Sequence, residues 1–89
     1  MKEDEKRFFR IVYERCRPGH IYEMTPRDII NILHNFGSMH YKRAWYLLKK
    51  WCGLGFYDYG VTLDLGWIEK YKLPERYKAL LEEKNARSL

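Results

Sequence analysis

Four positively charged residues and no negatively charged one lie between Gly37 and Gly53. They form two adjacent pairs, Lys42–Arg43 and Lys49–Lys50. The whole 89-residue chain carries a net charge of +5, so most of the excess falls on this short stretch. Ammonium and guanidinium groups bind phosphates, and cations gathered on one element are typical of a surface that binds a polyanion.

The residues that could hold a metal ion are few and far apart. They are Cys16, His20, His34, His40 and Cys52. A tetrahedral zinc site usually draws on two closely spaced pairs, and only one such pair, in "CRPGH", is present. Two cysteines are too few for a disulfide scaffold and favour buried thiols. Because both cysteines end predicted helices, a disulfide between them remains an alternative in a hyperthermophile. We expect no metal and no other cofactor.

Catalytic motifs are missing from the sequence. There is no nucleophile elbow, no phosphate-binding glycine loop and no carboxylate–histidine arrangement. Ser38 is the only serine before Ser88, and a helix cap explains it better than a nucleophile does. The sequence therefore predicts a protein that is not an enzyme.

Composition predicts one small, densely packed domain over residues 1–89. Hydrophobic residues make up 46% of the chain and aromatic residues 17%, which is too apolar for a disordered segment. The N-terminus is charged from Lys2 onward and lacks the apolar run of a signal peptide. No apolar run approaches the length of a membrane span, so we expect a soluble, cytoplasmic protein.

Apolar spacing and the positions of glycine and proline predict the elements that must position the basic stretch. Helices are expected over 3–17, 25–36, 38–52 and 74–87, a β-hairpin within 55–68, and an extended segment over 20–24. Thr25, Pro26 and Asp28 form a capping-box-like helix start. Gly37 should end that helix, and Ser38 should cap the next.

The helix predicted over 38–52 has two different sides. Tyr41, Ala44, Leu48 and Trp51 should form its buried stripe, with Leu47 at the edge of that stripe. The basic residues fall on the opposite side, together with Tyr46, which is the division that a groove-binding helix requires.

This order of elements resembles the winged helix-turn-helix family of DNA-binding domains. The resemblance is strongest in "AWYLLKKWCGLGFY", where Ala44, Leu48, Trp51, Gly55 and Phe56 match a common family pattern. It implies a mainly α fold with a small β-hairpin, a core over about 5–68, and an additional C-terminal helix over about 74–87.

The resemblance also implies sequence-specific binding of double-stranded DNA, with helix 38–52 in the major groove, as in a small transcriptional regulator. The residues expected at the DNA are Arg27, Ser38, Met39, His40, Lys42, Arg43, Tyr46, Lys49 and Lys50. Arg43 and Tyr46 are the candidates for reading base edges. Lys49, Lys50 and Arg27 are better placed for phosphates.

The hairpin departs from the family pattern, because it carries Asp58 and Asp64 and no basic residue. Phosphates would repel an acidic tip. We therefore expect a short wing used for packing, or one that makes only uncharged contacts through Tyr57, Tyr59 or Thr62.

The apolar sides of the first and last helices could close the core of one chain or pair two subunits, and of these a homodimer is expected. The candidate interface residues are Phe8, Phe9, Tyr77, Leu80 and Leu81. Two-fold symmetry would place the two recognition helices about 34 Å apart, on successive major grooves.

Three other interpretations of the basic helix stay open. It could bind an acidic protein partner, an alternative that the acidic hairpin favours. Exposed aromatic side chains could instead stack on single-stranded nucleic acid. The cations could also be an ordinary solvated helix surface.

Overall fold

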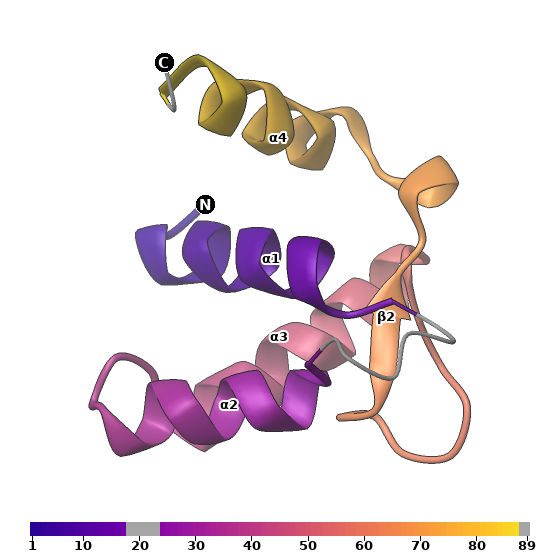
Figure 1. Ribbon diagram of the computed structural model, residues 1–89. Helices are drawn as coiled ribbons and strands as arrows, with labels where there is room; N and C mark the ends of the chain where they lie inside the picture. The colour runs from indigo at the N-terminus through magenta and orange to yellow at the C-terminus, as the bar shows by residue number, and fades with distance from the viewer. Residues whose placement is uncertain (18–23, 88–89) are drawn as a thin grey trace.

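Four α-helices and one two-stranded hairpin make up the protein in the computed structural model, which describes residues 1–17 and 24–87 (Figure 1). The elements are α1 (Glu3–Arg15), α2 (Pro26–Asn35), α3 (Tyr41–Leu54), β1 (Tyr57–Tyr59), β2 (Gly66–Ile68), a 3-10 turn η1 (Lys70–Lys72) and α4 (Glu75–Arg87). The coarse prediction, mainly helical with a small hairpin, is confirmed. The extended segment predicted over 20–24 lies outside the described residues, apart from Met24. None of the helices in these ranges is long and apolar enough to cross a membrane.

Helix α1 occupies the middle of the molecule, with α4 on one side and the α2–α3 pair on the other (Figure 1). Phe8 and Phe9 are neighbours in sequence and point in different directions, yet both are fully buried. Phe8 stacks on Trp51 of α3 at 5.2 Å between ring centroids, and Phe9 meets Tyr77 of α4 at 5.1 Å. An aromatic core therefore joins three helices.

This packing corrects the interface predicted for a homodimer. Phe8, Phe9, Tyr77 and Leu80 are all buried within one chain. Only Leu81, which is half-buried, has surface left for a partner. The physical reason is that α4 lies against α1 and covers the apolar side chains that sequence alone left without a partner. The homodimer itself stays a prediction, but these four buried residues cannot form its interface.

The start of α2 follows the sequence prediction. The Thr25 hydroxyl accepts a hydrogen bond from the Asp28 amide, and the Asp28 carboxylate accepts one from the Thr25 amide at 2.9 Å. This reciprocal capping box satisfies two backbone donors that a helix start leaves free.

Helix α3 begins two residues later than predicted, because His40 caps it instead of Ser38. Gly37 adopts a left-handed conformation with φ of 72°, which turns the chain back on α2. The amides of Ser38 and Met39 then both donate to the Leu33 carbonyl. Because these two residues complete the end of α2, they are not available to start α3. The far end of α3 passes through Gly53 and stops at Gly55, whose φ is 91°.

The two sides of α3 are largely as predicted. Ala44, Leu48 and Trp51 are buried, and so is Leu47, which was expected only at the edge. Tyr41 is the exception, because its side chain is 45% exposed. The later helix start puts Tyr41 in the first turn, beside the exposed rings of His34 and His40.

The hairpin is antiparallel, with Tyr57 opposite Ile68 and Tyr59 opposite Gly66. Its loop is fastened to the start of α2. Arg27 donates to the carboxylate of Asp64 at 2.7 and 3.2 Å, and the Arg27 amide donates to the Asp64 carbonyl at 2.9 Å. The hairpin is therefore held against α2 through three hydrogen bonds between one pair of residues.

Candidate nucleic-acid interface

The outward face of α3 forms a shallow open groove of about 360 Å³. Its lining consists of two cations and three aromatic rings: Tyr41, Lys42, Trp45, Tyr46 and Lys49. Tyr46 is 57% exposed and stands in the middle of the helix. Neither lysine forms an ion pair within the described residues. We call these five residues the α3 groove.

Arg43, the predicted base-reading residue, lies at the side of this groove and has an acidic partner. Its guanidinium donates to both carboxylate oxygens of Asp4 on α1, at 2.9 and 3.1 Å. These hydrogen bonds lower the pKa of the Asp4 carboxyl. The guanidinium also lies 5.5 Å from the centroid of the Tyr46 ring. Arg43 is therefore held in place rather than extended into solvent.

Lys50 is held by a second acidic residue of α1. Its ammonium donates to Glu5 at 2.8 Å, and the other oxygen of Glu5 accepts from Trp51 Nε1 at 3.0 Å and from the Tyr77 hydroxyl at 2.7 Å. Glu5 is only 2% exposed. Burial raises the pKa of Tyr77 to about 12, and its hydrogen bond to Glu5 adds to that increase. One carboxylate therefore links α1, α3 and α4.

The acidic residues of the hairpin are also paired. Asp64 is bound by Arg27, and these hydrogen bonds lower the pKa of the Asp64 carboxyl. Asp58 lies 3.4 Å from the ammonium of Lys72. Each of these two carboxylates of the hairpin therefore has a basic partner.

The remaining predicted residues lie around the turn between α2 and α3. Met39 is buried, which contradicts its expected place on the DNA-facing surface, because its side chain joins the hydrophobic core. Ser38 is exposed but caps no helix. His40 is exposed, and its Nδ1 accepts a hydrogen bond from the Lys42 amide at 3.2 Å.

His34, which sequence considered only as a metal ligand, lies beside His40. Its Nδ1 accepts from the Tyr41 amide at 3.3 Å, and the two histidine rings meet edge to face at 5.0 Å. Residues 1–17 and 24–83 contain no cluster of three metal-ligating side chains. No disulfide joins Cys16 and Cys52, and burial raises the pKa of Cys52.

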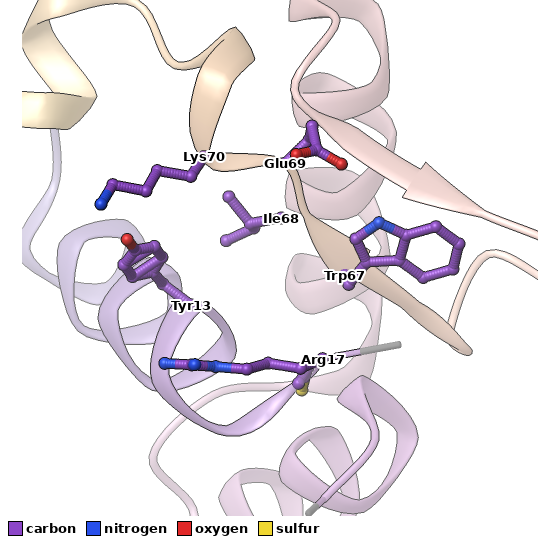
Figure 2. A pocket seen from close by; sticks show the side chains of 7 residues that line it. Tyr13, Arg17, Trp67, Ile68, Glu69 and Lys70 are labelled. Atoms are coloured by element: carbon purple, nitrogen blue, oxygen red, sulfur yellow. The ribbon is translucent and has the colours of Figure 1, made fainter. Parts of the chain in front are cut away.

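A second pocket lies elsewhere, between the end of α1 and β2 (Figure 2). Its volume is about 410 Å³. Arg17 and Lys70 bring positive charge to it, and Tyr13 and Trp67 bring aromatic rings, with Ile68 between them (Figure 2). None of the nine predicted DNA-binding residues lines this pocket, so it is separate from the α3 groove.

Comparison with known proteins assigns no role to the α3 groove or to the pocket between α1 and β2. No family model, no curated protein and no solved structure matches this chain.

Sequence reasoning missed the acidic residues that organise the basic face. Asp4 and Glu5 belong to "KEDEKR", which looks like an ordinary solvated helix start. Their partners on α3 are 39 and 45 residues away, so no local pattern points to the pairs. Trp45 and Tyr41 could have been found from the helical period, because both flank Lys42 and Tyr46 on the same side once the helix start is known.

Proposed function

We propose that this chain is a winged helix-turn-helix protein that binds double-stranded DNA, with α3 in the major groove. The observation that carries the proposal is the α3 groove, where Lys42 and Lys49 stand without acidic partners among the described residues and flank Tyr46. An α-helix fits the major groove of B-DNA. Two cations that lie two turns apart on its outward face can reach the phosphates that border the groove.

The order of elements supports this proposal. A capped α2 is followed by a tight turn, then α3, then a hairpin beside it. The ion pairs of Asp58 with Lys72 and of Asp64 with Arg27 also support the proposal. They balance the negative charge of the hairpin, which was the reason to prefer a protein partner over DNA.

A salt titration tests the proposal directly. Binding of a fluorescent duplex should weaken as salt rises, because each phosphate contact releases condensed counterions. With Lys42 and Lys49 as principal contacts, the slope of log K against log salt should be negative, with a magnitude of about 2 or more. A flat plot, or no binding to any duplex at 50 mM salt, would contradict the proposal.

Removing the acidic partner of Arg43 should strengthen DNA binding. In Asp4→Asn, the guanidinium loses its ion pair with α1 and at least one of its two hydrogen bonds there, because an amide offers one acceptor oxygen, and it can then reach a phosphate more easily. We expect affinity at 50 mM salt to rise about five- to tenfold, as for one added phosphate contact. Fluorescence anisotropy with the same duplex measures the change.

Glu3→Gln is the matched control for this experiment. It removes the same charge from the first turn of α1, but Glu3 pairs with Lys6 and not with a residue of α3. If both variants gain equally, the effect is one of net charge, and Arg43 has no part in binding.

A second candidate function is binding of single-stranded nucleic acid, favoured by the three aromatic rings of the α3 groove. Bases stack on such rings with little regard to sequence. Trp45 lines the groove, whereas Trp51 is fully buried, so Trp45 should report on the ligand. Tighter binding of a single strand than of its duplex, with tryptophan quenching that Trp45→Phe reduces, would favour this function.

A further inference from the structure

We infer that His34 and His40 together bind one backbone phosphate of the DNA, through the Nε2–H donors of their two rings at the turn before α3. This inference rests on the proposed function and adds to it a residue, His34, and a ligand group for the pair. The two histidines come from different elements, since His34 lies in the last turn of α2 and His40 caps α3.

The hydrogen bonds of the two rings determine where their protons lie. Each Nδ1 accepts a backbone N–H, from Tyr41 for His34 and from Lys42 for His40. A neutral imidazole whose Nδ1 accepts must carry its hydrogen on Nε2. The backbone of α3 therefore fixes both rings in the same tautomer, with an N–H donor on the far side of the ring from the helix.

Both donors are available to a ligand. The two side chains are exposed, and no acceptor for either Nε2 is found among the described residues. The rings are 5.0 Å apart, close enough to serve one acceptor group.

A phosphate suits this place better than a base edge. Each of the two Nε2–H groups is a donor, and phosphate oxygens only accept. It lies at the turn before α3, while the middle of the outward face, where base edges would be read, carries Tyr46. Phosphate contacts at the margin of a recognition helix fix its register on the duplex.

Substitution of the histidines by asparagine or glutamine distinguishes the role of Nδ1 from that of Nε2. In His34→Asn and His40→Asn, the amide oxygen takes the place of Nδ1 and keeps the backbone bond, and the outward donor is lost. Asparagine is also a favourable helix cap. At pH 8, we expect these variants to melt within a few degrees of the wild type and each to bind duplex DNA about three- to tenfold more weakly. A duplex selected from a random library for tight binding and an unselected duplex should lose affinity equally.

His34→Gln and His40→Gln make the opposite exchange, keeping an outward N–H and losing the backbone bond. They should melt at a lower temperature than the asparagine variants and bind DNA more tightly than these do at a temperature where all are folded. Equal weakening by asparagine and glutamine would show that the histidines act only through structure, and would overturn the inference.

Two further outcomes also decide the question. If the wild type binds duplex DNA and the asparagine variants bind it equally well, the inference fails while the proposed function stands. A loss confined to the selected sequence would mean that the histidines read a base, which overturns the phosphate assignment. If the wild type binds no duplex, the proposed function fails and this inference with it.

Discussion

Replacing Glu5 with alanine is expected to lower the free energy of unfolding by about 3 kcal/mol, a large part of the total for a domain of this size. The substitution leaves the buried Trp51 Nε1 and Tyr77 hydroxyl without their acceptor and leaves Lys50 without its counter-charge. Truncating one partner of a buried network costs more than the bonds are worth, because the remaining groups stay desolvated. The melting temperature should fall by at least about 12 °C, which calorimetry or circular dichroism would measure.

Glu3→Ala is the control, since Glu3 is in the same turn but mostly exposed. It should change the free energy of unfolding by no more than about 0.5 kcal/mol. Equal stabilities of the two variants would show that the Glu5 network contributes nothing.

The Glu5 contribution should also depend on pH. Burial alone would raise the pKa of Glu5, but hydrogen bonds from Lys50, Tyr77 and Trp51 together lower it below the ordinary value. A carboxyl whose pKa is lower in the folded state than in the unfolded state stabilises the fold at neutral pH and loses this effect in acid. The stability difference between wild type and Glu5→Ala should therefore shrink as the pH falls below roughly 4. A difference that stays constant down to pH 2 would contradict the assignment.

The double substitution Lys42→Ala, Lys49→Ala is expected to weaken duplex binding about 100-fold at 50 mM salt. It should also reduce the magnitude of the salt slope by about 1.8, because each lost phosphate contact removes about 0.9. Both side chains are exposed and unpaired in the described structure, so folding stability should stay nearly unchanged. Fluorescence anisotropy at several salt concentrations measures both quantities.

Lys70→Ala, Lys78→Ala provides a comparison with the same change in net charge. Both residues are exposed and lie outside α3, on η1 and α4. We expect this variant to weaken binding several-fold less than the α3 variant does. If the two double variants bind alike, long-range charge rather than the α3 groove determines binding.

Local patterns in the sequence predicted most of the elements, and the structure explains why. The capping box of Thr25 and Asp28 and the spacing of Ala44, Leu48 and Trp51 depend only on residues three or four positions apart. The hairpin was likewise predicted from a segment rich in aromatic and branched residues that Gly60 and Gly66 interrupt. Each of these signals is complete within one turn or one strand.

The organisation of the site could not be predicted in the same way. Whether Arg43 and Lys50 are free depends on Asp4 and Glu5, which approach only after α1 packs on α3. The start of α3 depends on amides of the preceding turn bonding to Leu33, and not on which residue is the best cap. The burial of Phe9 could not be predicted without knowing that α4 packs on α1. The apolar spacing within α1 does not show that a second helix covers it.

The bond between Glu5 and the Tyr77 hydroxyl also constrains how the chain is made. The two residues are 72 positions apart in the sequence. Contacts of such high sequence separation form late, because a long loop must close before they are gained. On the ribosome, the Glu5 carboxylate of α1 should therefore stay in water until Tyr77 has emerged. The protein should acquire its final core only after Tyr77 has been synthesised, and chains released before Tyr77 should remain open to proteases.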